Sequence, residues 1–319
     1  MGWFKKAGKS KLFVVFIFSL LSNFVLPFVF AQSSQIAIVK SRSVEPYEKA
    51  AQGIQHQLKE EGFDAHFEFY NIEGDIQKGK EISQKIQEKN TALVFTIGTE
   101  AFQSVSGHLN QIPLVTAMLV NPEGDEIGSP NQSNLYGAYL KVPYVKHFQL
   151  LKKLAPDLSP VTIIYIKSED QKSIAEAKAA AAQETLTVIP VPIESIQEFS
   201  AALDRASRES KALIMILNKE LYNSTTAKEL LLFSARNKFP IIAFAPNYVK
   251  SGALLSFSSD FFENGRSAAK LGASLLRSEP VKEHFIPTEK VWVAWHHGVA
   301  ETFGIDISGE GKEIIDEYV

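Results

Sequence analysis

The sequence predicts an α/β protein of two doubly wound lobes, each built on a parallel sheet. Short apolar, β-branched runs alternate with amphipathic helical stretches along the chain, an order typical of parallel sheets with helices on both faces. The alternation starts again near Lys141. The 319-residue chain is also about twice the usual domain of ~100–150 residues, which favours two lobes over one.

The first half predicts four strands separated by helices. In the first predicted helix, Ala50, Ile54 and Leu58 recur every four residues, as one buried helix face requires. The predicted strands span residues 35–40, 65–70, 92–97 and 113–116, and the predicted helices span 47–61, 76–89 and a short stretch from 100.

The second half repeats this order, although the halves share no sequence repeat of fixed period. Strands are predicted at 161–166, 185–190, 212–217 and 240–244, and helices at 144–154, 174–182, 196–208 and 225–237. An extended segment at 253–258, a helix at 261–276, a strand at 292–295 and a closing helix follow. No Gly/Ser-rich linker separates the halves, so short crossings that act as hinges are predicted.

The N-terminus predicts export. Four lysines precede an apolar run at 12–30 that closes on Val29-Phe30-Ala31, a small-x-small cleavage pattern. We expect residues 1–31 to be a signal peptide cleaved after Ala31, and the remainder to be periplasmic. The alternative is an uncleaved membrane anchor, since the run approaches the ~20 residues that span a bilayer. That alternative is weakened by four residues within the run, Ser19, Ser22, Asn23 and Pro27.

Composition and motifs exclude several functions. Beyond residues 1–31 the chain has 29 Lys and Arg against 36 Asp and Glu, a net charge of −7, which predicts no basic surface for nucleic acid. It has no cysteine, and therefore no disulfides, thiolate ligands or lipoprotein anchor. The chain lacks Gly-x-Ser-x-Gly, Walker, His-Glu-x-x-His and Gly-x-Gly-x-x-Gly motifs. Its one histidine pair, His296-His297, faces opposite sides if extended. We expect no catalytic residues, cofactor or metal site.

Candidate ligand residues follow the strands, because ligands of open α/β sheets bind beyond the carboxyl ends of strands, near helix N-termini. In the first half they are Ser41, Ser43 and Tyr47 after the first strand, Gly98 and Thr99 after the third, and Asn121 after the fourth. In the second half they are Ser168, Asn218 and Ser224, with Asp260 before the later helix.

Each candidate also has a purely structural explanation. Ser41 and Ser43 would donate to an anion and Tyr47 would form an aromatic wall, or this loop serves only to start a helix. Ser168 begins a Ser-x-x-Gln capping box. Asp260 would hold an ammonium group by a charge-assisted hydrogen bond, or act as an N-cap.

Longer segments point to a family. They are Thr96-Ile97-Gly98-Thr99-Glu100-Ala101, Ile112-Pro113-Leu114-Val115, Tyr248-Val249-Lys250-Ser251-Gly252-Ala253-Leu254-Leu255-Ser256, Asp260-Phe261-Phe262-Glu263-Asn264-Gly265-Arg266-Ser267-Ala268-Ala269 and Phe303-Gly304-Ile305. Together they resemble the ABC-transporter substrate-binding proteins of type I periplasmic-binding fold, in the group that includes tryptophan and tyrosine binders.

The resemblance covers nearly all of residues 35–307 and implies two lobes joined by three hinge crossings, a ligand in the cleft and a membrane permease as partner. Lobe 1 is expected to comprise 32–140 with about 247–276, and lobe 2 to comprise 141–246 with about 277–319. The chain has Asn121-Pro122 where the family usually has Asp-Pro, and Ser43-Val44-Glu45-Pro46 where it often has His-Pro. Both departures fall in the expected cleft and bear on ligand identity.

The predicted function is that of a monomeric periplasmic component of an ABC importer that captures a small molecule. An amino acid, aromatic in particular, suits the polar loops together with four aromatic side chains, Tyr47, Phe102, Tyr222 and Phe257. Two alternatives stay open. One is a periplasmic sensing module that signals to a membrane receptor or kinase, and the other is an exported enzyme on the same scaffold.

Overall fold

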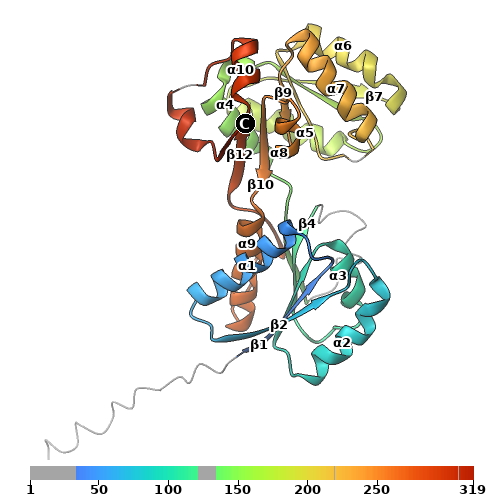
Figure 1. Cartoon of the computed structure of the whole chain (residues 1–319), viewed down its shortest axis with the longest axis vertical. Helices are drawn as coiled ribbons and strands as arrows, with labels where there is room; N and C mark the ends of the chain where they lie inside the picture. Colours follow the sequence, from blue (N-terminus) through green and yellow to red (C-terminus); the bar gives the residue numbers. More distant parts are fainter. Residues whose placement is uncertain (1–33, 121–133, 219, 308) are drawn as a thin grey trace, which may run out of the picture. The chain divides into compact units, whose positions relative to one another are not determined.

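The computed structural model describes residues 34–120, 134–218, 220–307 and 309–319. These residues form two α/β lobes, each with one sheet (Figure 1), which confirms the fold class predicted from the sequence. The expected signal peptide and Asn121 lie outside the described residues.

The first lobe contains a sheet in the order β11-β5-β4-β3-β1-β2, and every neighbouring pair is parallel. Its strands are β1 (Ser34–Lys40), β2 (Ala65–Asn71), β3 (Leu93–Ile97), β4 (Leu114–Leu119), β5 (Leu135–Tyr139) and β11 (Phe285–Pro287). Its helices are α1 (Glu45–Glu60), α2 (Gly79–Glu88), α3 (Thr99–Ser106) and α9 (Phe261–Leu276), with a 3-10 turn at Ile76–Lys78.

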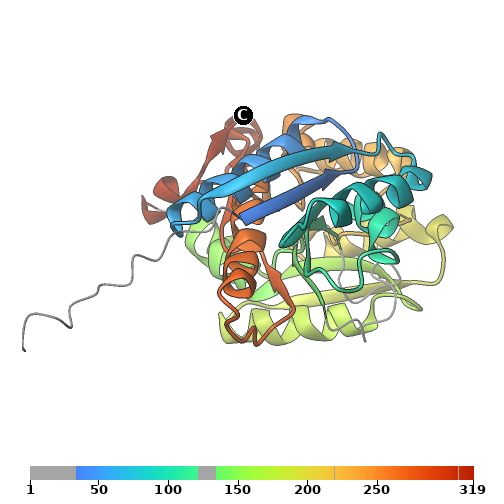
Figure 2. The ribbon, with the colours of Figure 1, turned by 90° about the horizontal axis from the view of Figure 1, so that it is seen from below.

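Helices cover both faces of this sheet. In β1, Ile36 and Ile38 belong to a core shared with α1 and α9, whereas Ala37 and Val39 belong to a core shared with α2 and α3. Figures 1 and 2 show the two helix pairs on opposite sides of the strands. Because successive strand residues point to opposite faces, burial of both faces explains the continuous apolar run of this strand.

Two glycines let α1 and α9 touch along their backbones. A Cβ atom on Gly53 would lie 2.0 Å from the carbonyl oxygen of Phe262, and one on Gly265 would lie 2.0 Å from the carbonyl oxygen of Ala50. Any larger residue at either position would therefore push the helices apart. This contact anchors α9 to the first lobe, although α9 follows a long excursion of the chain through the second.

The second lobe contains a sheet in the order β13-β12-β10-β9-β8-β6-β7. The pairs are parallel except β10 with β12, which is antiparallel. Its strands are β6 (Val161–Ile166), β7 (Val188–Ile193), β8 (Ala212–Ile214), β9 (Ile241–Ala243), β10 (Leu255–Ser259), β12 (Val291–Trp295) and β13 (Glu317–Tyr318). Its helices are α4 (Tyr144–Leu154), α5 (Gln171–Gln183), α6 (Phe199–Glu209), α7 (Ser224–Asn237), α8 (Pro246–Lys250) and α10 (His297–Phe303). Three 3-10 turns lie at Pro156–Leu158, Ile196–Glu198 and Gly309–Ile314.

The chain passes between the two sheets three times, as predicted. It leaves β5 for α4 after Tyr139, returns from β10 to α9 at Asp260, and leaves β11 for β12 after Pro287. The first two crossings are tied together, because the Ser259 hydroxyl donates to the carbonyl of Leu140 at 2.7 Å.

The expected lobe boundaries need correction. Residues 247–259 do not belong to lobe 1, because β10 pairs with β9 and β12 in the second sheet. Residues 277–288, which were expected in lobe 2, contain β11, and β11 pairs with β5 in the first sheet. A sequence pattern shows which residues are extended, whereas the neighbour that a strand pairs with is decided by tertiary packing.

Four short elements, β5, β11, α8 and β13, have no counterpart among the predicted elements. β5 is five residues long and contains Gly137, a residue that weakens a strand pattern. The glycine is needed there, because a Cβ atom would lie 2.7 Å from Cγ2 of Thr116 on the neighbouring strand. β11 is three residues long and ends in Pro287.

Candidate functional site

Residues that follow β1 and β3 meet at the carboxyl edge of the first sheet. The Ser41 side chain is buried, accepts the N–H of Ala101 at 2.9 Å and donates to the Ile97 carbonyl at 3.1 Å. Gly98 has a φ of +90°, and a Cβ atom there would lie 2.7 Å from Ser41 Oγ and 2.9 Å from Tyr47 Oη. Both backbone conformation and space therefore require glycine at this point.

The structure brings Ser41, Tyr47 and Gly98 close together, and it gives Ser41 a different role from the predicted one. A serine hydroxyl has one hydrogen to donate, and Ile97 receives it, so Ser41 supports the start of α3 instead of donating to an anion. Burial raises the pKa of Tyr47, with a further contribution from Glu100. Thr99 is the first residue of α3.

Two exposed side chains flank this edge. Ser43 Oγ accepts a hydrogen bond from Asn71 Nδ2 at 2.6 Å. Arg42 Nη2 lies 3.3 Å from Glu100 Oε1, and exposed pairs of this kind contribute little to stability. Arg42 and the N-terminus of α3 nevertheless place positive charge at one edge, which suits an anionic ligand group.

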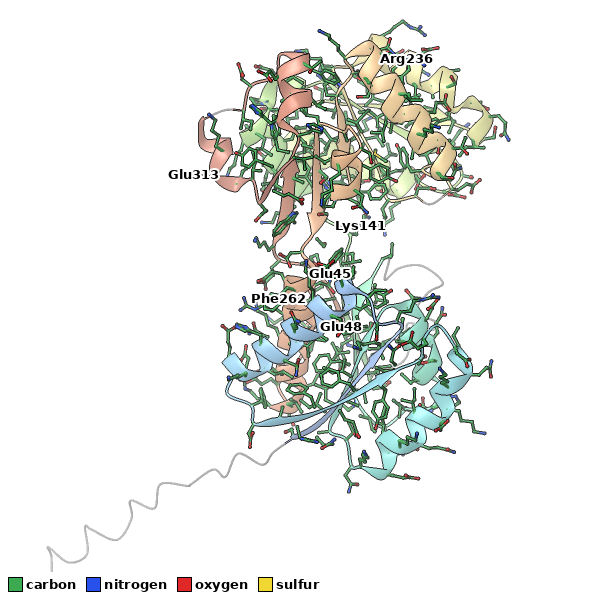
Figure 3. All side chains as sticks on the ribbon, viewed as in Figure 1. Glu45, Glu48, Lys141, Arg236, Phe262 and Glu313 are labelled. Atoms are coloured by element: carbon green, nitrogen blue, oxygen red, sulfur yellow. The ribbon has the colours of Figure 1, made fainter. Side chains whose placement is uncertain are left out.

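A cavity of 450 Å³ lies at the carboxyl ends of β6, β8 and β9 in the second lobe. Its wall includes residues that follow each of these strands, two residues of α4 and parts of the first two crossings, among them Lys141 (Figure 3). The lining residues used below are Lys141, Tyr144, His147, Glu169, Asp170, Ser173, Glu176, Phe244 and Phe257. The position agrees with the rule that ligands of open α/β sheets bind beyond the carboxyl ends of the strands.

One wall of the cavity is aromatic. The ring centroid of His147 lies 5.7 Å from that of Tyr144 and 5.5 Å from that of Phe257. Tyr144 Oη is 2.8 Å from Ser173 Oγ. Burial raises the pKa of Tyr144 to about 12 and lowers the pKa of His147 to about 4. Both groups are therefore neutral at pH 7.

Another wall is acidic. Asp170 Oδ2 accepts the N–H of Ile166 at 3.2 Å and the side-chain amide of Asn218 at 3.1 Å. The same amide lies 3.1 Å from Glu169 Oε2, and Asn218 Oδ1 accepts the N–H of Leu221. Asn218 thus lies outside the cavity lining and orients the carboxylates of Glu169 and Asp170. Its predicted role of bonding a ligand directly is not available while these contacts are made.

The remaining second-half candidates lie outside the cavity lining. Ser168 is exposed in the turn before α5, which begins at Gln171 with Asp170 at its N-cap, so the predicted capping box is wrong. Ser224 begins α7, whose cap is the side chain of Asn223. Asp260 Oδ1 accepts the N–H of Glu263 at 3.1 Å, which is the N-cap alternative weighed for Asp260.

Tyr144, His147, Asp170 and Phe244 were not among the predicted ligand residues. Two of them carried a usable signal, since Phe244 ends the predicted strand at 240–244 and Asp170 follows the predicted strand at 161–166 by four residues. Tyr144 and His147 are three residues apart on α4 and so share a helix face. Nothing in the local pattern says that this face is turned toward a cavity.

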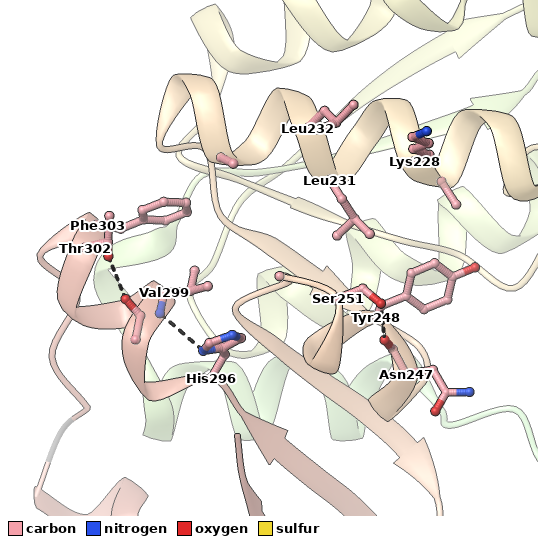
Figure 4. Close-up of a pocket in the computed structure, with 14 residues that line it drawn as sticks. Lys228, Leu231, Leu232, Asn247, Tyr248, Ser251, His296, Val299, Thr302 and Phe303 are labelled. Carbon is pink, nitrogen blue, oxygen red and sulfur yellow. Dashed lines mark hydrogen bonds between the residues drawn. The ribbon is translucent and has the colours of Figure 1, made fainter.

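A second hollow, of 740 Å³, lies between α7, α8 and α10 (Figure 4). Leu231 and Leu232 face it from one side and Phe303 from another. Two of its polar side chains form local hydrogen bonds: the Ser251 hydroxyl donates to the Asn247 carbonyl, and His296 Nδ1 accepts the N–H of Val299. The hollow shares no residue with the strand-end cavity.

Comparison with known proteins identifies the family. Residues 35–292 match the sequence model of the family described as ABC transporter substrate binding protein. The chain belongs to this family. A tyrosine-binding protein from Clostridioides difficile (strain R20291) is 23% identical over 243 residues, which cover 73% of this chain and 70% of that protein.

Solved structures of similar proteins agree with the fold of this substrate-binding protein. The ABC domain in complex with L-Trp from Streptococcus pneumonia has a TM-score of 0.57 at 22% identity, over 90% of this chain and 100% of that one. The ligand-free, open structure of a substrate-binding protein with adhesive properties from Clostridium difficile has a TM-score of 0.70 at 19% identity, over 90% and 99% of the two chains.

Membership in this family has direct consequences. The family consists of solute-binding proteins, which take a small-molecule ligand, work with a transporter permease and are typically exported. Within the described ranges, none of the helices combines the length and apolarity of a membrane crossing. Nor do three His, Cys, Asp or Glu side chains gather as metal ligands in the part of the chain that the structure describes.

Proposed function

We propose that this substrate-binding protein delivers an amino acid, with an aromatic one as the best candidate, to an ABC importer in the membrane. The observation that carries the proposal is the cavity at the ends of β6, β8 and β9, which combines aromatic and acidic walls. Its volume of 450 Å³ lies within the ~300–1,000 Å³ typical of small-molecule sites.

The first lobe supplies the complementary half of the proposed site. The N-terminus of α3, with Gly98 and Thr99, and the neighbouring Arg42 favour a carboxylate. Tyr47 borders the same edge, and Ser43 completes the proposed loop contacts. A ligand that contacts both lobes stabilises the arrangement in which both half-sites are formed, because only that arrangement makes all contacts.

The likeness to a tyrosine-binding protein and to a domain crystallised with L-Trp supports an aromatic amino acid. The low identities of 23% and 22% make the cavity chemistry the stronger argument. Its aromatic side chains suit a flat ring, and its carboxylates suit an ammonium group.

A thermal-shift screen tests the proposal. Residues 32–319, purified through unfolding to remove carried ligand, are heated with amino acids, peptides, sugars, nucleosides and metal ions. A ligand at a hundred times its dissociation constant adds ~2.7 kcal/mol, which raises Tm by roughly 5–10 °C in a chain of this size. We expect shifts with amino acids, largest with aromatic ones. A shift confined to sugars, nucleosides or metal ions would refute the amino-acid assignment.

We further propose that the protein is exported after cleavage behind Ala31 and acts as a periplasmic monomer. The lysine-flanked apolar run at 12–30 supports export. The intact mass of protein recovered from its host would begin at Gln32 if cleavage occurs there. Light scattering on a sizing column should give the mass of one chain, and a mass of two chains would contradict the monomer.

A further inference from the structure

Asp170 is a carboxylate in the cavity wall that accepts two hydrogen bonds, from the N–H of Ile166 and the amide of Asn218. Lys141 lines the same cavity but is engaged elsewhere, with Glu176 Oε2 at 3.6 Å and the Tyr144 ring at 5.7 Å.

Burial makes this arrangement costly in the absence of ligand. Asp170 is about half-buried, and this burial raises the pKa of its carboxyl. The neighbouring Glu169 also raises this pKa, whereas the two hydrogen bonds and the charge of Lys141 lower it. A partly desolvated carboxylate gains most from a cation placed beside it. Hydrogen bonds that hold Oδ2 in place also fix where such a cation would sit.

His147 is a second polar group of the same cavity. The residue is only 8% exposed, and its Nδ1 makes no hydrogen bond to any residue that the structure describes. The carbonyl of Pro143 opposes the lowering of the His147 pKa by burial, but it makes no hydrogen bond with Nδ1. Buried polar atoms seldom lack a partner, and a neutral imidazole does not repel a cation. The position is therefore suited to a ligand with a polar edge.

We propose that the second-lobe cavity selects its ligand by a primary ammonium group carried on a flat aromatic body, with Asp170 binding the ammonium group and His147, Tyr144 and Phe257 enclosing the ring. This inference rests on the proposed function and makes it more specific. It assigns the ammonium contact to Asp170 in place of Asp260, whose carboxylate caps α9.

Ligands that lack either the ammonium group or the carboxylate show which of the two groups the protein recognises. An amine without the carboxylate should keep its contacts with Asp170, whereas an acid without the amine loses them. On the refolded chain of residues 32–319, calorimetric titrations would compare L-phenylalanine, L-tyrosine and L-tryptophan with phenethylamine, tyramine and tryptamine, and with hydrocinnamate and N-acetyl-L-tryptophan. We expect the amines to bind at least about tenfold more tightly than the analogues that lack a free amine.

The variant Asp170→Asn removes the charge and keeps an oxygen that can accept the N–H of Ile166. Loss of a charge-assisted hydrogen bond should weaken binding of the amino acid by about 10–100-fold. Asp157→Asn is the matched control, because Asp157 is exposed in the turn at Pro156–Leu158 and makes the same change of charge. It should bind within about twofold of the parent.

Each outcome decides between the proposals. If the parent binds an amino acid and Asp170→Asn binds it equally well, or if hydrocinnamate binds as tightly as L-phenylalanine, the Asp170 assignment is wrong and the proposed function stands. If the parent binds none of the amino acids or amines, both are wrong. If Asp170→Asn fails to fold, the comparison of amines with des-amino acids on the parent decides alone.

Discussion

The buried side chain of Asn264, on α9, links the end of β4 to the segment that follows β11. It is fully buried on α9, and its Oδ1 accepts the N–H of Met118 at 2.7 Å. Its Nδ2 donates to the Thr288 hydroxyl at 2.8 Å, which donates to the Tyr139 carbonyl at 3.1 Å. Met118 has a φ of +63°, and the register between β4 and β5 shifts at this point. The shift leaves the Met118 N–H in need of a side-chain partner.

We expect Asn264→Ala to destabilise the protein by about 2–4 kcal/mol. The change leaves the buried N–H of Met118 without an acceptor, at a cost of about 1–3 kcal/mol, and adds a small cavity, which costs about 1 kcal/mol. Tm should fall by roughly 4–16 °C for a chain of this length. Unfolding in urea should be followed by far-UV circular dichroism, which reports the helices and strands of both lobes. Tryptophan fluorescence is less suitable, because Trp292 and Trp295 both lie in β12 and report the second lobe.

Asn237→Ala is the control for this prediction. Its side chain is exposed and donates to the Phe233 carbonyl of its own helix, so we expect a change within about 0.5 kcal/mol. A second variant, Thr288→Val, should couple to Asn264→Ala by more than about 0.5 kcal/mol in a double-mutant cycle. Stability of Asn264→Ala within 1 kcal/mol of the parent, by the same ~1–3 kcal/mol scale, would refute the reasoning.

Three further predictions follow from buried or capping groups. Burial lowers the pKa of His147 from 6.5 to about 4. Between these two pH values the unfolded chain binds more protons than the folded chain. The free energy of unfolding therefore falls as the pH drops, by up to about 3 kcal/mol. Urea unfolding at pH 7 and pH 5 should show less loss in His147→Phe, and equal losses would contradict the assignment. Gly265→Ala should cost about 3 kcal/mol, because its Cβ atom would meet the Ala50 carbonyl. Gly107→Ala, where no atom lies within 4 Å, is the control and should be neutral in thermal unfolding. Asp260→Ala should cost about 1 kcal/mol through the lost cap while amino-acid affinity stays within about twofold by calorimetry. A large loss of affinity would return Asp260 to the site.

Local sequence patterns were sufficient for most long elements. The apolar face of Ala50, Ile54 and Leu58 predicted α1, and the β-branched runs at 36–39 and 161–166 predicted β1 and β6. Two short strands were not predicted, because β5 contains Gly137 and β11 has only three residues. Such segments become strands because a neighbouring strand already offers free N–H and C=O groups, and that neighbour is distant in sequence.

The structure places predicted residues at strand ends but gives some of them other hydrogen-bond roles. The strand-end rule selected the loops of Ser41 and Gly98, which lie close together, and through Ser168 it came within two residues of Asp170. It misjudged Ser168 and Asp260 because a capping residue and a ligand residue have the same sequence pattern. Only the hydrogen bonds of the folded chain show which oxygen is already engaged.

The sequence by itself determined the fold class, because the periodic burial that separates strands from helices is a local property of the chain. Its longer segments resembled a family, and that resemblance implied the three crossings. Tertiary structure decided which strands share a sheet, which polar groups stay without partners, and hence where the cavity lies. Those features depend on contacts such as Asn264 with Met118, or β11 with β5, between residues more than a hundred positions apart. The energy of such a contact exists only after the chain has brought both partners together.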